Sequence, residues 1–134
     1  MSADMRPWRA SQLTRDDTFV LVARGAIAEE AILDLVDLAP STIRVSWTQD
    51  RGVTYLSTGE FLDLWCTQHR SSTRATLGLL RVTPAAGGPV PLQVREPRIV
   101  GSGLRWTVTA TGSRLPHSSG SCVLVLNPPQ DPTL

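Results

Sequence analysis

The stretch TFVLVARGAIAEEAILDLVDLAP, residues 18–40, decides how the rest of the sequence is interpreted. Its first six residues are apolar on both faces over the length of a strand, which predicts a central β-strand. Gly25 then breaks the strand pattern. Further on, apolar residues recur at the spacing of one helix face, and Pro40 ends the run; these residues are Ala28, Ala31, Ile32, Leu35 and Leu38. The stretch therefore predicts a strand followed by a helix.

The opposite side of this predicted helix is acidic. It carries Glu30, Asp34 and Asp37, none of which has a basic residue four positions away to pair with. Such a face is either solvated or a docking surface for a basic partner. Residues 41–134 contain nine arginines against five acids, so that partner is either a different basic protein or another copy of this chain.

Residues 41–57, STIRVSWTQDRGVTYLS, predict a β-hairpin. Ile43, Val45 and Trp47 alternate with polar residues, as expected for a strand with one packed face. The run Gln-Asp-Arg-Gly supplies a short turn, with Gly52 suited to a left-handed backbone conformation.

A capping box predicts the second helix. Ser57 is followed three positions later by Glu60, and this pair satisfies backbone donors at a helix start, here for a helix over residues 59–70. Residues 73–82 either continue the helix or form a strand, and their glycine and final valine favour the strand.

Later residues predict further strands separated by turns. Residues 104–110 alternate in polarity, whereas Cys122–Leu126 is apolar on both faces and predicts a second central strand. We therefore expect an α+β fold: a mixed, mainly antiparallel sheet with two helices packed on one face. The alternative is a partly closed β-barrel of the later strands, with helices. One domain over residues 17–126 is expected, between an N-terminal arm at 1–16 and a disordered Pro-rich tail at 127–134.

The composition excludes some partners. The 134-residue chain has a net charge of +1, so no global field attracts it to nucleic acid or an anionic membrane. No stretch approaches the ~20 apolar residues of a membrane span, and the N-terminal residues lack the apolar segment of a secretory signal. We expect a cytoplasmic protein with no membrane partner, whose two cysteines are free thiols.

The cysteines and histidines fall into two close pairs. Cys66 and His69 lie at i and i+3 of the predicted second helix, and His117 shortly precedes Cys122. Together they would form a Cys2His2 set suited to tetrahedral zinc. The sequence favours the other interpretation, in which both cysteines are buried structural residues, both histidines lie at the surface and no cofactor is bound. That predicted burial also disfavours a Cys–His nucleophile, which needs a partly exposed thiol.

The sequence favours a non-enzymatic protein-interaction, assembly or regulatory domain that acts through a protein partner or self-association. The residues expected to contact a partner are Trp8 in the arm, the acidic Glu30, Asp34 and Asp37, and the basic Arg70 and Arg74. One alternative is a nucleic-acid-binding regulator that uses the Arg-rich C-terminal half and a structural zinc; its binding would weaken steeply with salt. The other is a small enzyme with a reactive Cys or His.

Overall fold

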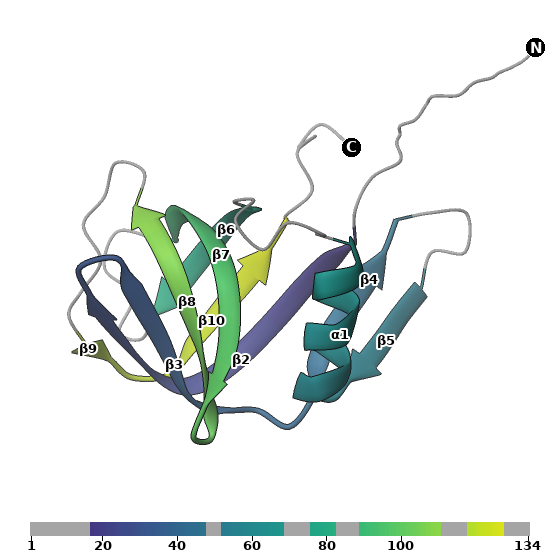
Figure 1. Cartoon of the computed structure of the whole chain (residues 1–134), viewed down its shortest axis with the longest axis horizontal. Coiled ribbons are helices and arrows are strands. Elements are labelled where there is room, and N and C mark those ends of the chain that lie inside the picture. The colour runs from purple at the N-terminus through teal and green to yellow at the C-terminus, as the bar shows by residue number, and fades with distance from the viewer. Residues whose placement is uncertain (1–16, 48–51, 69–75, 83–88, 111–117, 128–134) are drawn as a thin grey trace, which may run out of the picture.

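The structure, a computed structural model, describes residues 17–47, 52–68, 76–82, 89–110 and 118–127 (Figure 1). Within these ranges nine strands form one antiparallel sheet, and one helix packs against it. The strands are β2 (Thr18–Glu29), β3 (Ile32–Leu38), β4 (Thr42–Ser46), β5 (Gly52–Leu56), β6 (Thr76–Val82), β7 (Val90–Val100), β8 (Gly103–Ala110), β9 (Ser118–Ser119) and β10 (Cys122–Leu126). The helix is α1 (Thr58–Gln68).

Six of the strands close into a ring. Neighbouring strands follow the order β2, β3, β8, β7, β6 and β10, and β10 pairs with β2 to complete the circle. The first residues of β2 also pair with β4, which in turn pairs with β5, so the sheet continues outside the ring. Figure 1 shows this β4–β5 hairpin beside the ring, with α1 next to it.

The predicted fold, with two helices on one face of a sheet, is wrong because the described residues are mostly strand and contain one helix. The segment expected to form the first helix is the second half of β2 and all of β3, joined by a two-residue turn at Glu30 and Ala31. Leu33 and Leu35 are buried inside the ring, while Asp34 between them is only partly buried, which is the two-residue repeat of a strand. The apolar residues of this segment fit the repeat of a helix as well as that of a strand. Backbone pairing of the segment with β2 and β8 makes it a strand.

The alternative, in which the later strands partly close on themselves, is also wrong. The later strands β10, β6, β7 and β8 are neighbours in that order, but β8 joins back to β10 only through β3 and β2. The ring therefore closes only because the segment predicted as a helix forms a pair of strands.

Apolar side chains from the ring strands and from α1 fill the inside of the ring. Four aromatic rings meet where α1 packs against the strands: the ring centroids of Phe19 and Phe61 are 5.1 Å apart, and those of Trp65 and Trp106 are 5.3 Å apart. These edge-to-face contacts hold the helix against the sheet. Trp65 and Trp106 both belong to the core. Around them lie the buried Leu21, Ala23, Ala26, Leu33, Leu35, Leu80, Leu92, Val94, Leu104, Val108, Cys122, Leu124 and Leu126.

The local predictions for the middle of the chain are confirmed. The hairpin over residues 42–56 pairs as expected. The Ser57 N–H donates to Glu60 Oε1 at 2.8 Å, and the Glu60 N–H donates to Ser57 Oγ at 3.1 Å, which is the predicted capping box. Residues 76–82 form a strand, as their composition favours, and Cys122–Leu126 is a central strand with neighbours on both sides.

Candidate protein-binding surface

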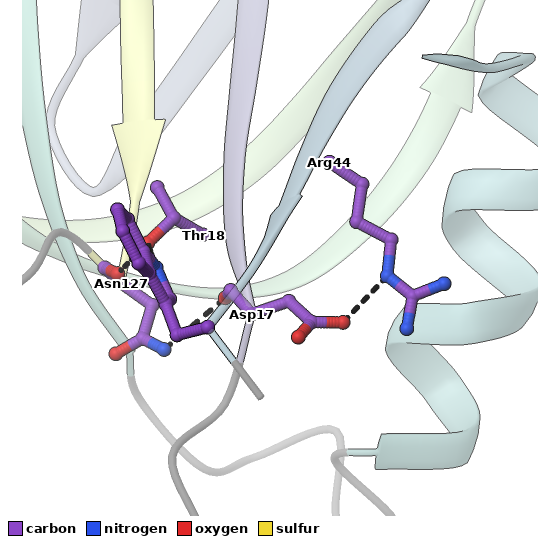
Figure 2. Close-up of polar contacts among 5 residues, drawn as sticks. Asp17, Thr18, Arg44 and Asn127 are labelled. Atoms are coloured by element: carbon purple, nitrogen blue, oxygen red, sulfur yellow. Dashed lines mark hydrogen bonds and ion pairs between the residues drawn. The ribbon is translucent and has the colours of Figure 1, made fainter. Parts of the chain in front are cut away.

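A polar network holds the β4–β5 hairpin and the end of β10 against the start of β2 (Figure 2). Thr18 Oγ1 donates to the carbonyl oxygen of Asn127 at 2.7 Å, and Trp47 Nε1 donates to Thr18 Oγ1 at 2.7 Å. The amide of Asn127 donates to the carbonyl oxygen of Asp17 at 3.2 Å. Asn127 thus contacts the folded body, although the predicted tail begins at this residue; residues 128–134 and 1–16 lie outside the described ranges.

An ion pair in the same network sets the orientation of β4. Arg44 Nε donates to Asp17 Oδ2 at 2.5 Å, and the side chains are 32% and 5% exposed, respectively. Figure 2 shows Arg44 reaching from β4 towards Asp17. Since successive residues of a strand point to opposite faces, holding Arg44 on the inner side directs Ile43 and Val45 outward.

The outward side of five neighbouring strands, β6, β10, β2, β4 and β5, is mostly apolar, although the exposed Arg81 of β6 lies on it directly beside Val123. One row of directly paired residues crosses all five strands, and its members are Leu79, Val125, Val20, Ile43 and Tyr55. None of these five side chains is buried. We call the whole surface the outer apolar face, and its residues are Val20, Val22, Ile43, Val45, Trp47, Val53, Tyr55, Leu77, Leu79, Val123 and Val125.

Helix α1 does not cover the outer apolar face. Its Phe61 and Trp65 contact Phe19 and Trp106, whose side chains point into the ring. The most exposed members of the face lie on β5, where Val53 is 59% and Tyr55 66% exposed. An antiparallel sheet with one packed face normally carries polar residues on its other face, and here that rule is broken.

The other half of the same ring follows the rule more closely. On β7, β8 and β3 the outward residues include Gln93, Arg95, Thr107, Thr109, Arg105 and Asp34, together with Ile32, although Ile99 and Val100 at the end of β7 are exposed apolar residues. The two halves share one core and one architecture. The apolar character of the first half therefore does not follow from closing the ring, and it needs a separate explanation.

The acidic residues predicted to form one face of a helix have separate positions. Asp34 lies opposite Arg105, whose Nε and Nη2 donate to its two carboxylate oxygens at 2.7 and 3.0 Å. The hydrogen bond from Arg105 and the charge of Asp34 raise the pKa of Arg105. Asp37 accepts a hydrogen bond from Ser102 Oγ at 2.7 Å, and Glu30 occupies the turn with a φ of 52°. Asp34 and Asp37 thus have partners on another strand and in a turn, and the three acids do not form one face of a helix.

A shallow hollow lies beside the Asp34–Arg105 pair. Its volume is about 430 Å³, and it is lined by Ile27, Glu29, Glu30, Ile32, Asp34 and Arg105. Two of the predicted partner-binding residues, Glu30 and Asp34, therefore share one surface. The Arg105 side chain already binds the carboxylate of Asp34, so the hollow has no free cation among these residues.

The two cysteines differ in environment. Cys122 is buried within the ring, where its thiol donates to the carbonyl oxygen of Gly25 at 3.7 Å and burial raises its pKa. Cys66 is exposed on α1, so the expectation that it is buried is wrong. His69 and His117 lie outside the described residues, and within the described residues no three His, Cys, Asp or Glu side chains gather as metal ligands. The zinc set stays a prediction.

Three other predicted partner-binding residues, Trp8, Arg70 and Arg74, also lie outside the described ranges. The residues of the outer apolar face were not among the predicted sites. The signal for them was nevertheless present, because TFVLVA and CVLVL are apolar on both sides and the hairpin at 42–56 alternates. From the sequence, the two runs indicate strands covered on both faces, and the apolar side of the hairpin, with Ile43, Val45 and Trp47, indicates a packed face. The second expectation is wrong, because Trp47 is exposed and Ile43 and Val45 are only half-buried on the outer apolar face.

Among the helices of the described ranges, none has the length and apolarity required to cross a membrane. No family model, curated protein or solved structure matches the chain. The argument for function therefore rests on the surface itself.

Proposed function

We propose that this chain is a non-enzymatic protein-interaction domain that binds a protein partner through the outer apolar face. The observation that carries the proposal is the row from Leu79 to Tyr55, in which five registered positions on five strands are all apolar and none is buried. Contiguous apolar patches on soluble proteins mark interaction sites, whereas single exposed apolar residues are ordinary.

The residue types on the face suit a protein partner. Tyr and Trp are enriched at the centre of protein interfaces because each buries a large apolar area and keeps one polar group for a hydrogen bond. Tyr55 and Trp47 supply these two types, although the indole N–H of Trp47 already donates to Thr18 Oγ1. Fully burying one large apolar side chain contributes about 2 kcal/mol, and association itself costs on the order of 4–15 kcal/mol, so a stable complex would have to bury most of the face.

The framework beneath the face is ordered before binding. Backbone pairing fixes all five strands, and the network around Thr18 and Asp17 holds the hairpin in place. A rigid surface loses little conformational entropy on association, which leaves more of the burial energy for affinity.

A pair of lysine substitutions tests the proposal. Val22→Lys places a charge on the outer apolar face at an exposed position, and Thr109→Lys places the same charge on the polar half of the ring. A binding protein isolated from the native source with the wild-type chain is purified, and its affinity for the three chains is measured by calorimetry. We expect Val22→Lys to weaken binding by at least about tenfold and Thr109→Lys to leave it unchanged.

Thermal unfolding of each variant verifies that both remain folded. Equal affinity for the two variants would overturn the proposal, because the partner would then bind elsewhere. Failure to find any protein partner, including the chain itself, would also overturn it.

A further inference from the structure

The sheet has a free edge at β5. Among the described strands, β5 pairs with β4 alone, on one side. Figure 1 shows β5 at the outside of the molecule, with β4 between it and the ring. The outer side of β5 therefore presents backbone N–H and C=O groups in the spacing that another strand would match.

Two of the features by which proteins prevent strand addition are missing from this edge: its five residues, Gly52–Leu56, include no charged residue and no proline. Four of the five are exposed, among them the two most exposed large apolar side chains of the described residues, Val53 and Tyr55. An exposed, uncharged apolar edge strand is a template for pairing with another strand.

We propose that a second copy of this chain adds to the edge, with the two β5 strands antiparallel about a two-fold axis at Thr54. Thr54 is the middle residue of β5, so this register pairs all five residues of one strand with all five of the other. It places Val53 of each copy opposite Tyr55 of its partner. Aromatic and β-branched side chains form favourable cross-strand pairs, and a two-fold interface is self-complementary by definition.

The arrangement extends the function proposed above, on which it rests. Val53 and Tyr55 belong to the outer apolar face, and in the antiparallel register they stay on the same side of the joined sheet. The outer apolar faces of the two copies then form one continuous surface. A second copy satisfies the backbone groups of the edge, while the joined surface remains available to a further protein.

A charge-exchange experiment tests the dimer. Sedimentation of the wild-type chain across a concentration series is expected to show a species of twice the monomer mass that dissociates on dilution. The double variant Val53→Lys/Tyr55→Lys places lysine opposite lysine, and Val53→Glu/Tyr55→Glu places glutamate opposite glutamate. Each is expected to be monomeric alone, and an equimolar mixture is expected to restore a salt-sensitive dimer, because lysines then oppose glutamates.

The control Gln93→Lys/Thr109→Lys adds the same charge to two directly paired positions on the polar half of the ring, and it is expected to dimerise like the wild type. A monomeric wild-type chain at high concentration, or a dimer that persists in both β5 variants, would overturn the dimer. A mixture that stays monomeric would also overturn it. Loss of partner binding in Val22→Lys with no dimer in the wild type would sustain the proposed function while rejecting this inference.

Discussion

Gly103 in β8 lies directly against Leu35 in β3: a Cβ atom on Gly103 would stand 2.0 Å from the Leu35 carbonyl oxygen. The atom in the way belongs to the backbone and cannot rotate aside. Strands β3 and β8 are consecutive members of the ring. The close approach of these two residues is therefore a condition for the ring to close in its observed form.

Replacing this glycine should destabilise the fold strongly. We expect Gly103→Ala to lower the free energy of unfolding by at least about 3 kcal/mol, since the added methyl group forces two strands apart. Gly59→Ala is the matched control, because a Cβ there meets nothing within 4 Å and lies in a helix. It should raise stability by about 0.5 kcal/mol. Urea unfolding measures both changes, and equal effects of the two substitutions would contradict the steric argument.

The ion pair between Arg44 and Asp17 should respond unequally to loss of its two members. The Asp17 side chain is 5% exposed and that of Arg44 is 32% exposed. Removing Arg44 therefore leaves a buried carboxylate without its ion-pair partner, whereas removing Asp17 leaves a cation that water can reach. We expect Arg44→Met to cost about 2 kcal/mol and Asp17→Asn about 1 kcal/mol. Chemical unfolding of each variant measures these values. The reverse ranking would show that the carboxylate does not depend on Arg44.

The two cysteines should differ in reactivity. Cys66 is exposed and Cys122 is buried with a raised pKa, mainly because burial disfavours the thiolate. An aromatic disulfide reagent at neutral pH should modify one thiol rapidly in the folded protein and two in denaturant. Cys66→Ser should remove the rapid phase, and Cys122→Ala should leave it intact.

The buried thiol also predicts a pH dependence of stability. The unfolded thiol ionises near its ordinary pKa of 9.0, whereas the folded one stays protonated to higher pH. The stability that burial of the thiol contributes is fully present below the unfolded pKa. It is lost as the pH rises from there through the higher folded pKa, because the unfolded state then releases a proton that the native state retains. Wild-type stability relative to Cys122→Ala should therefore decrease above about pH 9. A constant difference from pH 7 to 10 would contradict burial of this thiol.

Sequence patterns predicted those elements whose structure depends on near neighbours. The hairpin over residues 42–56 follows from alternation and a turn, and the start of α1 follows from the reciprocal bonds of Ser57 and Glu60. Local signals also favoured the strand at residues 76–82. For the hairpin and the start of the helix, the stabilising contacts lie within a few residues, whereas the strand at 76–82 pairs with β7 and with the distant β10.

The candidate site was only partly predictable. The sequence favours an interaction, assembly or regulatory domain that binds a protein partner or itself, but the proposed surface uses none of the residues that the sequence assigns to partner binding. In the sequence, the apolar residues Val20 and Val125 indicate strands that are buried on both faces. Which face is covered depends on where α1 packs, and Phe61 and Trp65 place it on the inner side.

By itself the sequence determined where chain segments alternate, turn and begin a helix, because those properties depend on side chains a few residues apart. The tertiary structure decided the state of the segment from Gly25 to Leu38, whose apolar residues match both a helical and a strand repeat. Its Leu33 pairs with Trp106 and its Asp34 with Arg105, more than seventy residues away along the chain. These pairings between distant residues all form when the ring closes, and a pattern of neighbouring residues in the sequence cannot predict them.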